Sequence, residues 1–134
     1  MQENSPTLFM FVSDTNILVY HAGGEESAVA FFNEHQRDIF YVPSIVVAEF
    51  LSYPLIIESS VNAFKSFVSQ MIVVNLDFAI AELAADIRRR HRVKLMDAVV
   101  ALTALTTNAT LVTKNTRDFK RIVGLQLFDL TSVG

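Results

Sequence analysis

The chain has 134 residues, half of them hydrophobic (51%), and carries 14 acidic and 11 basic side chains for a net charge of −3. This composition is too apolar for disorder and fits one domain with a substantial core, and no run of about 18 uncharged apolar residues predicts a membrane span. With no cysteine, disulfides and thiolate metal sites are excluded. We therefore expect a single cytoplasmic domain over residues 1–134, with residues 1–7 as a loose N-terminal segment.

The first half of the chain predicts two strands with helices between and after them. Short, nearly continuous apolar runs at residues 8–13 and 39–42 are typical of strands buried on both faces of a parallel sheet. Ser44 is a plausible N-cap for the helix that follows the second strand. The expected helical segments of this half are a turn at 17–20 and helices at 25–37, 44–51 and 61–69.

In the second half, Asp77 is a plausible N-cap for a helix whose apolar residues recur at helical spacing, and these are Ile80, Leu83, Ala84 and Ile87. Residues 97–106 are apolar nearly all round, which indicates a central helix. The expected strands are 71–74, 110–113 and 125–128, with a loop or helical turn at 115–119. Alternating strands and helices predict an α/β fold, a three-layer α/β/α sandwich with a mostly parallel central sheet.

Four carboxylates lie in surroundings that predict burial: Asp14, Glu49, Asp97 and Asp118. A buried carboxylate is costly unless it is paired or binds a metal. Functional groups of open α/β sheets gather beyond the carboxyl ends of the strands, and Asp14 directly follows such a strand. If the fold brings the four together, they form an acidic cup suited to a divalent cation.

Each acid also has an ordinary structural explanation. Asp14 and Asp97 could be a turn residue and a helix cap, Glu49 could lie on the outer face of an amphipathic helix, and Asp118 could cap a loop. None of the four decides the matter alone. The metal-site hypothesis requires Asp14 and the 113–118 loop to share one edge of the sheet, with Glu49 and Asp97 reaching it from helices.

Together these blocks resemble the PIN-domain nucleases, and among them the VapC-type toxins of toxin–antitoxin pairs. The resemblance runs from about residue 8 to residue 130. It rests on a strand followed by Asp14-Thr15-Asn16, on Val47-Ala48-Glu49, on the segment Asp97-Ala-Val-Val-Ala-Leu-Thr-Ala, and on Thr113-Lys-Asn-Thr-Arg-Asp118-Phe. Met96 departs from the family, which often has proline there, and the bulky segment 50–54 makes the adjoining wall of the cleft hard to predict.

The resemblance implies an endoribonuclease that depends on Mg²⁺ or Mn²⁺ and serves as the toxin of a type II toxin–antitoxin system. The four acids carry over as catalytic and metal-binding residues, with Thr113 and Asn115 as supporting catalytic groups and Thr15 and Asn16 as further candidates. The implied partners are RNA, a small antitoxin and a second copy of the chain. Such hard cations prefer oxygen ligands, which suits carboxylates.

A basic cluster precedes Asp97 and could hold the phosphates of a substrate. Cations at a helix C-terminus are also favourable for the helix itself, so this cluster has an alternative explanation. The candidate RNA-binding residues are Arg88, Arg92, Lys94, Lys114 and Arg117.

Three other functions stay open at this point. The chain could be a PIN-fold nuclease of RNA processing outside a toxin–antitoxin pair, or a PIN-fold binding module without activity. It could also be a phosphoacceptor domain, although the third strand ends in Val74-Asn75-Leu76 and lacks the acceptor aspartate. Residues 50–67 are apolar enough to be either an interface or core.

Overall fold

The computed structural model describes residues 7–132, and most of the segment expected to be loose (1–7) lies outside this range. A five-stranded sheet has the order β3-β2-β1-β4-β5, and every neighbouring pair is parallel. The predicted α/β architecture is therefore confirmed. The strands are β1 (Met10–Ser13), β2 (Ile39–Pro43), β3 (Ile72–Val74), β4 (Thr110–Thr113) and β5 (Leu127–Asp129).

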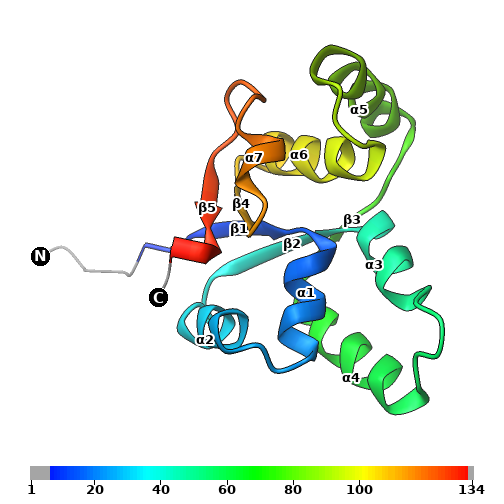
Figure 1. Cartoon of the computed structure of the whole chain (residues 1–134), viewed down its shortest axis with the longest axis vertical. Coiled ribbons are helices and arrows are strands. Elements are labelled where there is room, and N and C mark those ends of the chain that lie inside the picture. Colours follow the sequence, from blue (N-terminus) through cyan, green and yellow to red (C-terminus); the bar gives the residue numbers. More distant parts are fainter. Residues whose placement is uncertain (1–6, 133–134) are drawn as a thin grey trace, which may run out of the picture.

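Helices cover both faces of the sheet. Figure 1 shows α1, α2 and α4 on one side and α5, α6 and α7 on the other, with α6 between the sheet and α5. No helix within residues 7–132 has both the length and the apolar character needed to cross a membrane. The helices are α1 (Thr15–Ala22), α2 (Glu26–Glu34), α3 (Ser44–Leu51), α4 (Glu58–Val68), α5 (Phe78–His91), α6 (Leu95–Thr107) and α7 (Thr116–Phe119), followed by a 3₁₀ turn at Leu130–Ser132.

Several helix boundaries differ from the predicted ones because nearby polar side chains form hydrogen bonds that the sequence did not predict. Asp14 accepts a hydrogen bond from the backbone N–H of Ile17 (3.0 Å), which starts α1 at residue 15, earlier than the turn expected at 17–20. Ser44 does not cap α3, since its hydroxyl accepts from the N–H of Leu76 (3.0 Å) and the N-cap is Pro43. The predicted cap at Asp77 is confirmed by its bond from Ile80 N–H. Other ends differ by one to three residues, as is common.

The α6 helix begins at Leu95, so Asp97 lies within its first turn and is not its N-cap. All residues from Ala98 to Ala104 are buried, which confirms the expectation of a central helix. By contrast, α5 packs against α6 and leaves its other side open. Leu83, which we expected to be buried, is 49% exposed for this reason.

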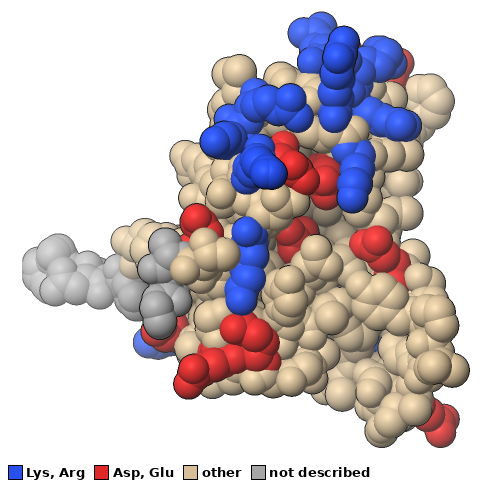
Figure 2. Space-filling model, in the orientation of Figure 1, with Lys and Arg blue, Asp and Glu red and all other residues tan. Residues whose placement is uncertain are grey.

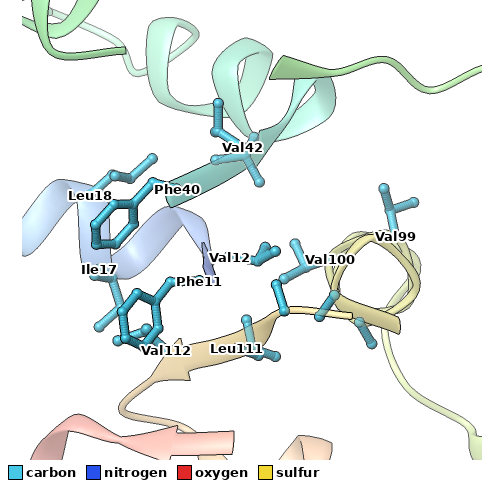
Figure 3. Packing of buried hydrophobic residues seen from close by; sticks show 14 of the residues in the cluster. Phe11, Val12, Ile17, Leu18, Phe40, Val42, Val99, Val100, Leu111 and Val112 are labelled. Atoms are coloured by element: carbon cyan, nitrogen blue, oxygen red, sulfur yellow. The ribbon is translucent and has the colours of Figure 1, made fainter. Parts of the chain in front are cut away.

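The core is built on the two central strands, whose side chains alternate between the two layers of helices. Val12 and Leu111 face Val100 of α6, whereas Phe11 lies on the side of Ile17 in α1 (Figure 3). These side chains are at most 4% exposed. Because β1 and β4 are buried on both faces, their register is fixed by packing, and their carboxyl ends lie at the same edge of the sheet.

This packing predicts the effect of truncating a central leucine. Leu111→Ala removes a fully buried side chain of β4 (0% exposed) and should lower the free energy of unfolding by about 2–5 kcal/mol. Leu83→Ala is the matched control, since that leucine is half exposed, and its loss should be well below that of Leu111→Ala. Urea denaturation followed by circular dichroism measures both, and equal losses would contradict the described core.

Candidate functional site

Asp14 is held at the carboxyl end of β1 by two hydrogen bonds. Its Oδ1 atom accepts from the backbone N–H of Ile17, and its Oδ2 atom accepts from the hydroxyl of Thr113 at 2.8 Å. The register that pairs Ser13 with Val112 places these two residues side by side at the ends of β1 and β4. Asp14 is 8% exposed and Thr113 is fully buried, so the carboxylate has one fixed position.

Glu49 reaches the same edge from α3. The hydroxyl of Thr15, the first residue of α1, donates a short hydrogen bond to its Oε1 atom. Thr15 is 5% exposed and follows Asp14 directly, so a single turn of the chain positions both Asp14 and Glu49. The partly buried Glu49 is thus not on an outer, solvated helix face.

Asp118 and Asn115 come from the segment after β4. The side-chain amide of Asn115 donates to Oδ2 of Asp118 at 2.6 Å, and the backbone N–H of Asn115 donates to the hydroxyl of Thr113 at 2.9 Å. A chain of hydrogen bonds therefore runs from Asp118 through Asn115 and Thr113 to Asp14. Asp97 approaches from the first turn of α6.

All four acids line one hollow of about 270 Å³ at the carboxyl edge of the sheet. A larger hollow of about 400 Å³ lies beside Asp38, which precedes β2 at the opposite edge, and contains no second acid. The converging carboxylates make the smaller hollow the candidate site. Its lining consists of Asp14, Thr15, Asn16, Glu49, Lys94, Met96, Asp97, Val100, Asn115, Asp118 and Phe119.

The surroundings of two of the acids oppose their ionisation. Burial raises the pKa of Asp14 above its ordinary value of 3.8, the charge of Glu49 raises it further, and hydrogen bonds from Ile17 and Thr113 partly oppose this. Burial also raises the pKa of Asp97, as do the charges of Asp118, Asp14 and Glu49, while Lys94 lowers it. The pocket thus concentrates negative charge that its own residues do not neutralise.

This donor set fits a hard divalent cation. It offers carboxylate oxygens and an amide oxygen, with no thiol or imidazole in the lining, as Mg²⁺ and Mn²⁺ prefer. A bound cation would favour the charged form of Asp14, whose pKa is raised, and would reduce the repulsion among the acids. Within residues 7–132 no group of three or more His, Asp or Glu side chains is arranged to hold a metal ion directly. Mg²⁺ usually keeps several waters and is bound through one or two carboxylates.

The candidate RNA-binding residues are not all placed together. Lys94 lines the acidic hollow, and Arg88 and Arg92 lie beyond it at the end of α5. Lys114 turns away, pairing with Glu25 at 3.3 Å and lying over the ring of Tyr20. Arg117 is exposed on α7 and does not line the hollow. Figure 2 shows Lys and Arg side chains gathered over α5 and beside a group of carboxylates.

Two contributions were not evident from the sequence. Met96, Val100 and Phe119 form the apolar wall of the hollow, although their sequence context marked them only as core or helix start. The bond from Thr15 to Glu49 joins residues 34 positions apart, and no local pattern predicts it.

The chain was compared with known protein families and structures. The family model described as PIN domain matches residues 11–125. No curated protein sequence matches the chain. Among solved structures, VapBC2 from Rickettsia felis, bound to a DNA fragment from its promoter, is similar at 25% identity with a TM-score of 0.76, covering 90% of this chain and 98% of that one.

Two further structures are similar over nearly the whole domain. VapBC-1 from nontypeable Haemophilus influenzae is 25% identical with a TM-score of 0.71, and the match covers 92% of this chain and 99% of that one. DNA-bound VapBC from Salmonella typhimurium has a TM-score of 0.78 over 92% of this chain and 99% of that one. At 24% identity, the last comparison supports the fold alone.

The raised pKa of Asp97 predicts a pH-dependent effect of Asp97→Asn in metal-free protein. Between 3.8 and the raised folded pKa, the folded state binds more protons than the unfolded state, so the free energy of unfolding falls as pH rises through this window. The variant lacks this loss and should be more stable than wild type at neutral pH, with the difference vanishing below pH 3.8.

The measurement is urea denaturation in EDTA across the acid-to-neutral range. Asp77→Asn is the matched control because Asp77 is an exposed cap outside the hollow, and asparagine caps helices equally well. A constant difference between Asp97→Asn and wild type at all pH values would contradict the described charge cluster.

Proposed function

This chain belongs to the PIN-domain family, and from that premise we propose that it is a metal-dependent endoribonuclease, the toxin of a toxin–antitoxin pair. The observation that carries this proposal is the convergence of Asp14, Glu49, Asp97 and Asp118 on one hollow at the carboxyl edge of the sheet. The similarity to VapBC structures at 25% identity supports the toxin assignment.

In this proposal the chain's own residues hold the acids in place before substrate arrives. Thr113 fixes Asp14, Thr15 fixes Glu49, and Asn115 fixes Asp118. Side chains locked by hydrogen bonds and packing keep a site close to its productive geometry. Asp97 has no such hydrogen bond within residues 7–132, and its position depends on the first turn of α6, which continues into the buried residues from Ala98 on.

Mg²⁺ or Mn²⁺ would be held by the four acids and, when bound, activates a water and neutralises charge on the phosphoryl oxygens. The apolar wall of Val100 and Phe119 lowers the local dielectric, which strengthens every charge interaction in the hollow. Lys94 lies at the rim and can bind a substrate phosphate next to the acids. No histidine or serine nucleophile is required.

RNA is proposed as substrate because basic side chains adjoin the acidic hollow despite the net charge of −3. Arg88, Arg92 and Lys94 are the proposed contacts of the RNA backbone. Lys114 is less suited, since it is already paired with Glu25, and Arg117 lies outside the hollow. Local fields near a cleft, not the net charge, determine such binding.

A small antitoxin and a second copy of the chain are the proposed protein partners. The sequence left open whether the segment 50–67 is an interface or core, and the structure shows buried and exposed parts. Phe50 and Phe64 stack in the core, whereas Leu55 and Ile57 are 97% and 62% exposed. Leu55 also has a positive φ of 68°, which is strained for a leucine. A contiguous exposed apolar patch marks a site of protein association, and we propose that these two side chains form part of one.

Two other functions are retained. The same acids would serve a PIN nuclease of RNA processing outside a toxin–antitoxin pair. A catalytically inactive binding module is less well supported, because the four acids are all present and all line the hollow.

Metal-dependent RNA cleavage tests the activity. Wild type should cleave single-stranded RNA with Mg²⁺ or Mn²⁺ and lose this activity in EDTA, and Asp14→Asn should cleave roughly 100-fold more slowly or worse because it removes one charge from the metal site. Asp77→Asn is the control and should cleave like wild type. Equal, EDTA-resistant cleavage by wild type and Asp14→Asn would reject the proposal.

Growth of bacteria that express the chain tests the toxin assignment. Wild-type protein should arrest growth, Asp14→Asn should not, and co-expression of the proposed antitoxin should restore growth. Metal-dependent cleavage in vitro without growth arrest would favour the RNA-processing alternative. Absence of both cleavage and Mn²⁺ binding by calorimetry would favour the inactive binding module.

A further inference from the structure

A second hollow lies next to the acidic one, on the other side of the turn between α5 and α6. Its volume is about 620 Å³, and it is lined by Ala85, Arg88, Arg89, Arg92, Val93 and Leu95. It contains three guanidinium groups and no carboxylate. Basic and acidic hollows are thus separated by a few residues of chain.

The turn itself is the wall that the two hollows share. Val93 and Leu95 line the basic hollow, whereas Lys94, Met96 and Asp97 line the acidic one. A ligand that crosses this turn therefore passes Lys94 on its way from one hollow to the other. Such a path between the two hollows suits an extended ligand that carries one charge on each of its units.

The arginines of the basic hollow differ in whether a carboxylate already pairs with their guanidinium group. Asp86 pairs with Arg89 (3.3 Å) and with Arg90 (3.1 Å), and Arg90 does not line the hollow. Arg88 and Arg92 form no ion pair with any carboxylate of residues 7–132. They are exposed at the C-terminal end of α5, so two guanidinium groups are free to bind an anion.

Arg92 is also held in an unfavourable backbone conformation. It is the C-cap of α5 with φ 54° and ψ 39°, a left-handed position where helices most often have glycine. Its N–H donates to the carbonyl of Arg88 at 2.9 Å, so the two residues are fixed relative to each other. A strained arginine at a position that suits glycine is a reason to look for a role of its side chain.

The floor of the hollow is apolar. Val93 is buried, and Leu95, the first residue of α6, is 50% exposed and open to the hollow. Guanidinium groups around an apolar floor match a nucleotide, whose phosphate is bound by charge and whose base or ribose packs on apolar surface.

We propose that this basic hollow is a subsite for a nucleotide of single-stranded RNA neighbouring the one that is cleaved, with Arg88 and Arg92 binding its phosphate and Leu95 contacting its base or ribose. The inference rests on the proposed ribonuclease function and adds where the strand lies: across the α5–α6 turn, past Lys94. Single-stranded RNA fits better than an acidic peptide because the apolar floor of Val93 and Leu95 beside the guanidinium groups can pack a base or ribose, which a run of carboxylates does not offer.

The test measures affinity and its salt dependence with full-length protein that carries Asp14→Asn to stop cleavage. A short labelled single-stranded RNA is titrated at salt concentrations between about 50 and 200 mM. Adding Arg88→Gln and Arg92→Gly should weaken binding roughly tenfold or more and reduce the slope of log K against log salt by about 0.7, the value for one lost phosphate contact on a single strand.

Three further variants separate the parts of the proposal. Arg90→Gln is the matched control, on the same helix and with the same charge, and should leave affinity nearly unchanged because Arg90 is paired with Asp86 outside the hollow. Leu95→Gln should weaken binding without changing the salt slope. Arg92→Gly alone should raise the midpoint of thermal unfolding while weakening RNA binding, which excludes misfolding as the cause.

The outcomes separate this inference from the function on which it rests. If wild type cleaves RNA with metal but the Arg88 and Arg92 variants bind RNA with the affinity and slope of Arg90→Gln, the subsite is wrong and the ribonuclease assignment stands. Arginine-dependent RNA binding without any cleavage would support the subsite and contradict the nuclease. If polyglutamate, and not RNA, loses affinity in the variants, the hollow binds an acidic protein partner and the proposal is overturned.

Discussion

The site depends on one constraint, the burial of a carboxylate where two parallel strands end together. Asp14 and Thr113 are neighbours only because β1 and β4 pair with Ser13 opposite Val112. A shift of one residue in either strand would turn Asp14 out of the pocket and place apolar side chains in solvent. The packing of Val12 and Leu111 against α6 therefore also fixes the position of the acid.

The burial of Asp14 has a cost that neighbouring groups offset only in part. The N–H of Ile17 and the hydroxyl of Thr113 favour its charged form, and the start of α1 adds the positive end of a helix dipole. Desolvation and Glu49 act in the opposite direction and raise its pKa. A fold optimised for stability alone would not bring further acids to this carboxylate, so the cluster is better explained by a ligand that carries positive charge.

Local patterns in the sequence predicted the parts of the fold and the site that are encoded locally. The strand before Asp14, the buried helix after Asp97 and, away from the site, the cap at Asp77 follow from apolar runs and capping residues. The bond from Thr15 to Glu49 could not be predicted, because it depends on how α1 and α3 pack. Likewise, the sequence predicted Ser44 as a helix cap and Lys114 as a phosphate contact. In the structure Ser44 accepts a hydrogen bond from Leu76 and Lys114 pairs with Glu25, both of which are distant in the sequence.

The α5–α6 turn places basic side chains beside the acidic site in a chain of net negative charge. Residues 92–97 place Lys94 and Asp97 on one side and Arg92 on the other, so the repulsion that the proposed RNA meets at the acids is balanced within a few residues by attraction. Because α5 packs on α6 and leaves its outer side open, its arginines lie in solvent, and Arg88 is not paired with a carboxylate of residues 7–132. The half-exposed Leu83 and the exposed Arg88 thus have one cause: α5 packs chiefly on α6 and forms an outer layer of the fold.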